Sequence, residues 1–528
     1  MQGLTGNEQT TLQIMKWQFQ GIEDGCKKFV AYPDKHFWDL WRTRKDYLKV
    51  NGISVSKVAD TYVVTKYENQ SNVGQKFKGK PIKSVMYPDL LKGKQKEHVI
   101  TLCNALIRQG AALDASITGA GKTYCARAVA KELGVEVLIV CPFTALSMWR
   151  RVTAEIGVQA EVINYEKLRT FKTPYLRKLD VEKKSKSKHD NSELLEWLIT
   201  KDKLIVFDES HRLRNYKTIS SDMLLAATKQ GYDTLLLSAT LADSPLNMQI
   251  TGFALRLFST LSGYWPWAFQ HGVKKQKDNY GNTLFVFDEN NPQHLKNINA
   301  QIFPEHGSRL TKLDLPELFK ETFITAEAYD MKSASQIQDY YDEMSKTPGD
   351  YMRLRREIEL CKIDTFVQLA KDALEEGNSV AIFVNFRDTL FQLAEILETD
   401  CVIFGDQNGS KKGLQDRENN NRRFQENTSR VIICTTQSGS EVISLHDLTG
   451  DYPRVSLISP TPDSTALKQV FGRIDRAMSE SNSVQKIIYA AGTVEEDVAY
   501  RVRKKLKNLS LLNDGDVTES FEMVEGVQ

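Results

Sequence analysis

The segment that most constrains the fold of this 528-residue chain is ALDASITGAGKTYCARAVAKELG, residues 112–134. An apolar run, a glycine-rich turn and a stretch with helical periodicity follow one another along it. Glycine permits backbone angles at which successive N–H groups converge on phosphate oxygens. The segment therefore predicts a nucleotide-binding loop after a buried strand, with a turn made by Gly119, Ala120 and Gly121.

The two residues after this turn carry the groups that a triphosphate needs. Lys122 supplies a charge for the β- and γ-phosphates, and Thr123 supplies a hydroxyl for Mg²⁺. The helix from Tyr124 adds its positive N-terminal end. Ser116 departs from the strict pattern, which has glycine or alanine there. Taken alone, the motif has one alternative, a chance strand, turn and helix that contain a lysine.

A second motif, LIVFDE at residues 204–209, ends an apolar run with two adjacent carboxylates. Asp208 is predicted to hold Mg²⁺ and Glu209 to orient the attacking water. Neighbouring carboxylates repel each other, and a bound divalent cation offsets that cost. A surface Asp-Glu turn is the alternative. Together the two motifs predict an ATP-hydrolysing site with ATP and Mg²⁺ as cofactors.

A third motif, QVFGRIDRA at residues 469–477, predicts a turn and helix that carry Gln469, Arg473 and Arg476. Two arginines three positions apart lie on one helical face and can point together at a γ-phosphate. Arginines that form only surface salt bridges are the alternative.

The chain alternates short apolar runs with helical patterns. The predicted strands are VEVLIVCP, KLIVFDE and DTLLLSAT between residues 85 and 260, and SVAIFVNF, RVIICTT and RVSLISP between residues 320 and 500. Apolar strands separated by helices predict parallel sheets covered on both faces. We expect an α/β fold with two such domains in series. Residues 1–80, with the aromatic and basic HFWDLWRTRKDYLKV and the β-rich TYVVTKYEN, predict a small accessory domain or a packing extension of the next domain.

Three polar segments, residues 180–193, 270–283 and 405–423, are predicted to be solvated loops, with a nucleic-acid contact as the alternative for each. RVRKKLK, residues 501–507, predicts either a solvated helix face or a grip on a nucleic-acid backbone.

Bulk composition excludes several classes of protein. The net charge is only +2, so global charge does not indicate a nucleic-acid binder. Seven scattered cysteines, without a C-x-x-C pair, predict reduced thiols. No apolar run approaches the length of a membrane span and the N-terminus lacks signal-peptide order, so we expect no membrane partner. We expect a cytoplasmic or virion-internal protein and no secretion.

The series TGAGKT, VFDESH, LSAT and QVFGRIDR resembles superfamily 2 helicases and translocases, and most closely their Snf2-like members. LIVCPFTALSMWRRVTAE, VINYEKLR, SRLTKLDLPELFKE and AAGTVEEDV are similar to further Snf2 segments. The region SLHDLTGDYPRVSLISPTPDSTALKQVFGRIDR particularly resembles helicase-like ATPases of phages and large DNA viruses. The resemblance covers about residues 85–510.

This resemblance implies two tandem RecA-like domains and gives roles to single residues. It places Lys122 and Thr123 at the triphosphate and Mg²⁺, Asp208 at Mg²⁺ and Glu209 at water. Arg473 and Arg476 become arginine fingers, and Gln469 becomes a coupler to the γ-phosphate or nucleic acid. Gln95 becomes a contact to adenine. Ser238 and Thr240 couple hydrolysis to movement.

The implied domains are an accessory domain at 1–80, a first RecA-like domain at 81–312, a second at 313–500, and a basic C-terminal helix and tail at 501–528. Insertions are expected in the first RecA-like domain near 180–193 and 262–310. Some positions depart from the Snf2 pattern, among them Val442 in place of glycine and Asp475 in place of histidine. These departures put a preference for duplex DNA in doubt but leave the ATPase prediction intact.

A motor must hold nucleic acid through phosphates, because it is indifferent to sequence. Hydroxyls, amides and cations after predicted strands are the candidates, and a cap or a packing residue is the favoured alternative for each one taken singly. They are Thr144, Tyr165 and Arg212 in the first RecA-like domain, and Asn385, Arg387, Thr435, Thr436 and Ser438 in the second.

Three functions remain open at this point. The favoured one is an ATP-driven DNA helicase or translocase that acts on duplex or branched DNA and works with replication, recombination or transcription proteins of a phage or virus. The second is an RNA helicase or a transcription-termination ATPase. The third is a protein-remodelling or structural component that retains the fold.

Overall fold

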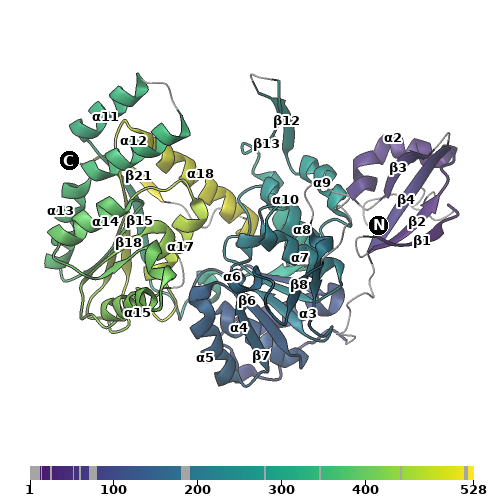
Figure 1. Cartoon of the computed structure of the whole chain (residues 1–528), viewed down its shortest axis with the longest axis horizontal. Coiled ribbons are helices and arrows are strands. Elements are labelled where there is room, and N and C mark those ends of the chain that lie inside the picture. The colour runs from purple at the N-terminus through teal and green to yellow at the C-terminus, as the bar shows by residue number, and fades with distance from the viewer. Residues whose placement is uncertain are drawn as a thin grey trace. The chain divides into compact units, whose positions relative to one another are not determined.

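The computed structural model describes residues 12, 15–23, 26–50, 53–58, 61–69, 80–179, 191–278, 281–343, 347–440, 443–515 and 521–527. The chain divides into two compact units (Figure 1). Unit 1 consists of Met1–Ser116, Lys122–Leu310 and Leu511–Asp516. Unit 2 consists of Ile117–Gly121, Thr311–Ser510 and Val517–Gln528.

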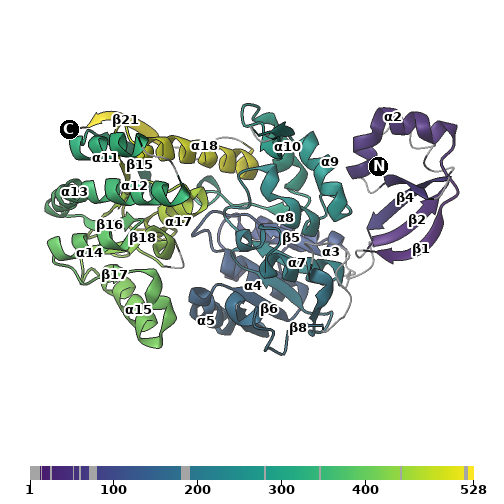
Figure 2. The same ribbon diagram turned by 45° about the horizontal axis from the view of Figure 1, so that its top comes forward.

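Unit 1 begins with a four-stranded antiparallel sheet of order β1-β2-β4-β3. Helix α2 (Lys35–Val50) lies across one face of this sheet (Figure 2), and Phe37, Leu40, Ile53 and Val64 form the small core between them. The strands are β1 (Gln18–Glu23), β2 (Cys26–Ala31), β3 (Ile53–Val58) and β4 (Thr61–Asn69). The β-rich prediction for TYVVTKYEN is confirmed by β4.

The main sheet of unit 1 has six parallel strands in the order β14-β5-β11-β10-β6-β7. Every residue of the central strands β5, β11, β10 and β6 is buried, which explains their continuous apolar sequence. The strands are β5 (Ala111–Asp114), β6 (Val137–Cys141), β7 (Ala160–Asn164), β10 (Leu204–Phe207), β11 (Thr234–Leu237) and β14 (Gly307–Ser308). The covering helices include α3 (Gln95–Gln109), α4 (Lys122–Leu133), α5 (Leu146–Ile156) and α7 (Ile219–Lys229).

The second half of unit 1 adds an aromatic helical layer and a β-ribbon. Its elements are α8 (Gln249–Ala254), α9 (Tyr264–Gln270), β12 (Val273–Lys277), β13 (Thr283–Phe287) and α10 (Gln293–Ile302). The predicted solvated loop at 270–283 is wrong, because residues 273–277 pair in antiparallel register with residues 283–287. The lysines of β12 gave no apolar pattern that would predict a strand, because most side chains of this strand are exposed to water.

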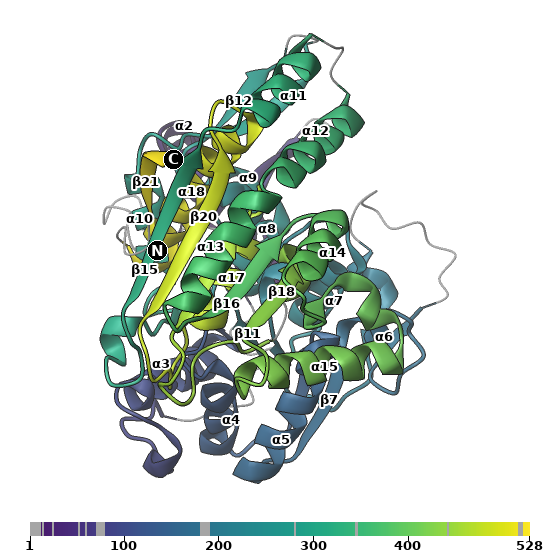
Figure 3. The same cartoon turned by 90° about the vertical axis from the view of Figure 1, so that its left-hand side faces the viewer.

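Unit 2 is built on a seven-stranded parallel sheet of order β17-β18-β16-β19-β20-β15-β21. The strands are β15 (Thr322–Tyr329), β16 (Ser379–Val384), β17 (Val402–Ile403), β18 (Val431–Thr435), β19 (Arg454–Ile458), β20 (Ser483–Ala490) and β21 (Glu522–Val527). Helices α13 (Ile363–Glu375) and α14 (Arg387–Ile396) cover one face (Figure 3), and α17 (Ser464–Ile474) and α18 (Val494–Asp514) cover the other. The two predicted parallel α/β sheets are confirmed.

Two helices outside this layer, α11 (Lys332–Asp342) and α12 (Pro348–Cys361), precede α13. The predicted solvated loop at 405–423 is also wrong, because helix α15 (Lys411–Gln425) forms most of it. Ser410 caps this helix by accepting a hydrogen bond from the Gly413 N–H, and Phe424 is its buried anchor. With so few apolar residues, the segment shows no helical periodicity. Of the third polar segment, residues 180–190 lie outside the described part of the chain.

The end of α18 belongs to the core of unit 1. Leu511 and Leu512 lie in the same hydrophobic cluster as Phe253 and Trp267. The Asn299 side chain donates a hydrogen bond to the Leu512 carbonyl at 3.0 Å. In the described part of the chain, no helix is both long enough and apolar enough to cross a membrane.

The core position of Leu512 gives a stability prediction. Leu512→Ala removes a side chain that is 0% exposed and leaves a cavity, so we expect the free energy of unfolding to fall by roughly 2–5 kcal/mol. Leu313→Ala, at a residue that is 84% exposed, is the matched control and should change it by less than about 0.5 kcal/mol. Urea unfolding followed by tryptophan fluorescence measures both. Equal effects of the two substitutions would contradict the assignment of this segment to the core.

Candidate functional site

The predicted phosphate loop has the backbone geometry that its glycines suggested. Strand β5 ends at Asp114 and helix α4 begins at Lys122, with the turn between them. Gly119 and Gly121 both have φ of 85°, in the left-handed region that only glycine adopts without strain. The predicted order of strand, turn and helix is confirmed.

Buried polar groups fix the start of this loop within unit 1. The Asp114 carboxylate accepts a hydrogen bond from the Ser116 N–H at 2.9 Å and lies 3.1 Å from His98 Nε2. The other His98 nitrogen lies 2.8 Å from Ser308 Oγ, and Ser116 Oγ accepts a hydrogen bond from the Leu310 N–H. Burial alone would raise the pKa of Asp114, but His98 and nearby donors hold it below its ordinary value. The hydroxyl of Ser116, the departure from the strict pattern, therefore ties the loop to the segment after β14.

Lys122 lies among the acidic groups that the sequence analysis assigned to the same site. Its Nζ donates a hydrogen bond to the Ser116 carbonyl at 2.9 Å. Burial lowers the pKa of Lys122, and the charges of Glu209, Asp114 and Asp208 oppose that effect. The acid pair at the end of β10 thus acts directly on the lysine of the loop.

Asp208 is held from two sides by aromatic residues. Its Oδ2 accepts a hydrogen bond from Trp149 Nε1 at 2.7 Å, and its backbone carbonyl accepts one from the Tyr165 hydroxyl at 2.7 Å. Burial, followed by the charge of Glu209, raises the pKa of Asp208 to about 6. Sequence reasoning missed Trp149, because 59 residues separate it from Asp208 and only the fold brings them together.

Glu209 has a backbone conformation that is costly for any residue with a side chain. Its φ is 50° and its ψ is 50°, in the left-handed region. Its N–H donates to Asp208 Oδ1 at 2.9 Å, and its Oε2 lies 3.3 Å from His211 Nδ1. Strain of this kind is retained where it positions a functional group. The charge of this carboxylate favours the protonated form of the loop lysine.

The donor set fits a magnesium ion that shares its ligands with a nucleotide. Thr123 offers a hydroxyl and Asp208 a carboxylate whose negative charge is destabilised by burial. Among the described residues, no three His, Cys, Asp or Glu side chains gather closely enough to hold a metal ion. Mg²⁺ characteristically binds through one or two protein groups together with phosphate oxygens and water. The residues present fit this mode of binding.

The remaining predicted residues of unit 1 lie beside these strands. Ser238, directly after β11, accepts a hydrogen bond from the Thr240 N–H at 3.2 Å and lies 3.4 Å from His211 Nδ1. His211 thus links Ser238 with Glu209. Gln95, at the first turn of α3, accepts a hydrogen bond from the Lys92 N–H at 2.8 Å.

In unit 2, both predicted arginines hydrogen-bond to the chain between α16 (Thr436–Gly439) and β19. Arg473 donates to the carbonyls of Ser440 at 2.6 Å and Ile443 at 2.9 Å. Arg476 donates to the same Ile443 carbonyl at 3.0 Å and to Ser444 Oγ at 2.5 Å. Gln469 lies one helical turn before Arg473 and is buried. Val442 lies outside the described residues.

Residues Ile117–Gly121, the turn of the loop, belong to unit 2, where they pack against α17. A Cβ atom on Gly472 would lie 2.6 Å from Thr118 Cβ, and one on Gly119 would lie 2.7 Å from Arg476 Cγ. Both positions therefore require glycine for this approach. The turn and the helix that carries the arginines are neighbours within this unit.

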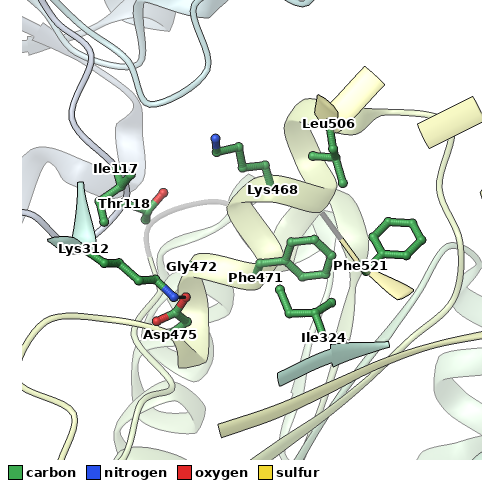
Figure 4. Close-up of a pocket in the computed structure, with 10 residues that line it drawn as sticks. All are labelled: Ile117, Thr118, Lys312, Ile324, Lys468, Phe471, Gly472, Asp475, Leu506 and Phe521. Atoms are coloured by element: carbon green, nitrogen blue, oxygen red, sulfur yellow. Dashed lines mark ion pairs between the residues drawn. The ribbon is translucent and has the colours of Figure 1, made fainter. Parts of the chain in front are cut away.

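A cavity of about 50 Å³ lies next to this packing (Figure 4). Phe471, Phe521 and Ile324 form an apolar side, and Lys312 forms an ion pair with Asp475 on the other. The pair gives a local reason for the aspartate at this position.

The predicted nucleic-acid contacts of unit 1 differ in accessibility. Tyr165 is fully buried, and its hydroxyl is used by Asp208, so it presents no surface for a phosphate in this structure. Arg212 is partly exposed and lies 3.8 Å from Glu166. Thr144 is half-buried, and its Oγ1 has no hydrogen-bond partner among the described residues.

The predicted contacts of unit 2 follow the adjacent parallel strands β16 and β18. Asn385 is held by Glu359, which accepts hydrogen bonds from its backbone N–H at 2.9 Å and its side-chain amide at 2.8 Å. Arg387 is exposed and pairs with Asp406 at 2.8 Å. Three hydroxyl residues at the end of β18 are buried, namely Thr435, Thr436 and Ser438.

Comparison with known proteins gives the family of this chain. Residues 90–243 match the family described as type III restriction enzyme, res subunit. A putative ATP-dependent RNA helicase of Acanthamoeba polyphaga mimivirus is 30% identical over 477 residues, which are 82% of this chain and 85% of that relative.

Solved structures also match, among them two with TM-scores below 0.5. The Sulfolobus solfataricus SWI2/SNF2 ATPase core in complex with dsDNA has a TM-score of 0.32 at 16% identity and covers 83% of this chain and 96% of its own. S. cerevisiae Dbp5 bound to RNA and ADP BeF3 has a TM-score of 0.44 at 15% identity, with 83% and 93% covered. The family assignment therefore depends on the relative from mimivirus and not on these structures. Together with the loop, acid pair and sheets described above, that relative shows that this chain belongs to the superfamily 2 helicases, which are ATP-hydrolysing enzymes.

Proposed function

We propose that this protein is a DNA-stimulated ATPase that uses Mg²⁺-bound ATP to move along duplex or branched DNA during replication, recombination or transcription of a phage or viral genome. One observation carries the ATPase part of the proposal. Lys122, Asp208 and Glu209 act electrostatically on one another at the carboxyl edge of a single parallel sheet, where open α/β sheets bind their ligands.

Each residue of this group has a distinct task in the proposal. Lys122 leaves the Ser116 carbonyl to bind the β- and γ-phosphates, and Thr123 and Asp208 hold the metal ion. When bound, Mg²⁺ neutralises charge that develops on the phosphate oxygens. Glu209 orients the attacking water and takes its proton. His211 contacts both Glu209 and Ser238, so a shift of the Glu209 side chain would be transmitted to Ser238 at the end of β11.

The residues of α17 and α3 complete the proposed nucleotide site. Arg473 and Arg476 stabilise charge on the γ-phosphate, as arginine fingers do, and Gln469 senses that phosphate from the preceding helical turn. Both arginines donate hydrogen bonds to the carbonyl of Ile443, and these bonds would have to be exchanged for contacts to the phosphate. Gln95 is assigned to the adenine base.

The choice of DNA is supported by the Snf2-like motifs in the chain, and RNA is the second candidate. The relative from mimivirus is named an RNA helicase, which favours the second candidate. In both cases the proposed contacts are to phosphates, through Thr144, Arg212 and Arg387 and the loops that carry Asn385, Thr435, Thr436 and Ser438. The exposed Arg387 is the strongest of these candidates, since its guanidinium is already at the surface.

Lys122→Ala tests the phosphate-loop assignment. The substitution removes the charge that binds the β- and γ-phosphates, so we expect ATP turnover to fall by at least roughly 100-fold. Steady-state phosphate release at saturating nucleic acid measures this. Lys96→Ala, on the exposed face of α3, is the control and should retain full activity. An active Lys122→Ala protein would refute the assignment.

A panel of nucleic acids tests the choice of partner. We expect linear duplex, forked or four-way-junction DNA to stimulate ATP turnover several-fold more than single-stranded DNA or RNA of matched length. Strongest stimulation by RNA would replace the DNA proposal with its RNA alternative. No stimulation by any nucleic acid would favour a protein-remodelling or structural role.

The raised pKa of Asp208 gives a pH-dependent prediction for Glu209→Gln. This substitution removes the catalytic carboxylate, so ATP turnover should fall by roughly 100-fold or more. It also removes the like charge beside Asp208 and the opposite charge that supports Lys122. The second loss is the same at pH 7.5 and pH 5.0, so the stability of the variant relative to wild type, without metal, should be roughly 1 kcal/mol higher at pH 7.5 than at pH 5.0.

The sign of the stability change follows from the protonation of Asp208. In the folded protein this carboxyl ionises only above about pH 6, whereas its ordinary pKa is 3.8. The repulsion that Glu209→Gln relieves exists above pH 6 and disappears as the pH falls through that value. Thermal unfolding at pH 7.5 and 5.0 without divalent cations measures it, and Glu193→Gln at an exposed site is the control. A stability change that is equal at both pH values would contradict the coupling.

A further inference from the structure

Most residues of the β12–β13 ribbon are exposed, and nothing in the ATPase site uses this element. Its two strands form a two-stranded sheet of their own in the described part of the chain. Figure 1 shows the ribbon extending away from α9 and α10. An isolated two-stranded ribbon is only marginally stable in water, so its persistence needs a specific cause.

That cause is an aromatic base and a closed end. The ring of Phe285 lies 4.0 Å from that of Trp265 and 6.2 Å from that of Phe269, measured between centroids. Phe287 and Val273, the first cross-strand pair, belong to the hydrophobic core of unit 1. These contacts fix the base of the ribbon on α9.

At the other end, Asp278 and Asn282 close the ribbon. The Asp278 carboxylate accepts hydrogen bonds from the Asn282 N–H at 2.7 Å and from its side-chain amide at 2.9 Å. These two hydrogen bonds join the ends of β12 and β13, although most side chains of the ribbon are exposed.

The register gives the two faces of the ribbon different chemistry. Lys275 pairs with Phe285 and Lys277 pairs with Thr283, so these four side chains lie on one face. The Nζ of Lys275 lies 5.6 Å from the ring centroid of Phe269, which is 38% exposed, and 5.8 Å from that of Phe285. We call Lys275, Lys277, Phe285 and Phe269 the cationic–aromatic face. The opposite face carries the exposed apolar side chains of Leu284 and Val286 together with Gln276 and Lys274.

The charges on the ribbon select the kind of partner. Of the acids next to its strands, Asp288 pairs with Lys274 at 2.7 Å and Asp278 is used in the turn. Lys275 and Lys277 remain as exposed positive charges beside exposed aromatic surface. Lysines that bind phosphates next to rings that stack on bases are the combination by which proteins hold single strands without reading their sequence.

We propose that the cationic–aromatic face of the β12–β13 ribbon is a binding site for a single-stranded segment of nucleic acid. Lys275 and Lys277 bind consecutive phosphates, and Phe269 with Phe285 stacks on an unpaired base. The proposal rests on the proposed function only in that nucleic acid is the partner. It adds a site outside both parallel sheets, and it gives a helicase a means of holding a strand after the duplex has opened.

The first test measures the electrostatic half of the site. The double variant Lys275→Gln with Lys277→Gln is compared with wild type by fluorescence anisotropy, using single-stranded DNA and RNA oligonucleotides of one sequence over a salt series. Loss of two phosphate contacts should reduce the slope of log affinity against log salt by about 1.4 and weaken binding roughly tenfold at low salt. The matched control, Lys332→Gln with Lys371→Gln, removes the same charge from exposed helices of unit 2 and should bind like wild type.

The second test measures the aromatic half. Phe269→Leu keeps an apolar side chain against Trp265 but removes the ring. Binding of a normal oligonucleotide should weaken about fivefold, and binding of an abasic oligonucleotide of equal length should be unchanged. Urea midpoints equal to that of wild type would show that these variants are folded.

The outcomes separate this proposal from the proposed function. Wild-type affinity and salt slope in the double lysine variant, in a protein whose ATPase is stimulated by nucleic acid, would overturn the ribbon site alone. The exposed Leu284 and Val286 would then favour a protein partner instead. If wild type binds no oligonucleotide and no nucleic acid stimulates its ATPase, the ribbon site and the proposed function both fail.

Discussion

The repulsion between the carboxylates of Asp208 and Glu209 is the constraint on which the site depends. Burial and the neighbouring charge raise the pKa of Asp208 to about 6, so an ionised pair at neutral pH is held at a cost. Lys122 offsets only part of that cost, because burial also disfavours the positive charge of this lysine. The site is therefore prepared for additional positive charge, and a metal ion bound with a nucleotide would supply it.

A second set of buried residues supports this strained arrangement. Trp149 and Tyr165 hold the two ends of Asp208, and the left-handed backbone at Glu209 is stabilised by its bond to Asp208. The loop is held in a comparable way, since Ser116 and Asp114 are bonded to His98 and to the chain after β14. Preorganisation of this kind keeps the reacting groups in place while the charges change.

In unit 2 the structure gives several predicted residues a second task. Asn385 is fixed by Glu359, and Arg473 and Arg476 hold the carbonyl of Ile443. Lys362, fully buried, forms an ion pair with Glu495 at 2.9 Å and a hydrogen bond with Ser459 at 2.7 Å, which joins α13, α18 and the end of β19. These bonds satisfy buried polar groups that would otherwise be costly. Any movement of these residues toward a ligand has to break or exchange them.

The sequence by itself determined the parallel sheets, the phosphate loop and the acid pair. These features depend on local patterns, namely continuous apolar strands, glycines at positive φ and carboxylates directly after a strand. Only the tertiary structure decided which distant side chains support them, as Trp149 does for Asp208 and Ser308 for His98. It also turned two predicted loops into helix α15 and the β12–β13 ribbon. The helix is anchored by one buried phenylalanine and the ribbon by an aromatic base, and such long-range contacts leave no periodic signal in the sequence.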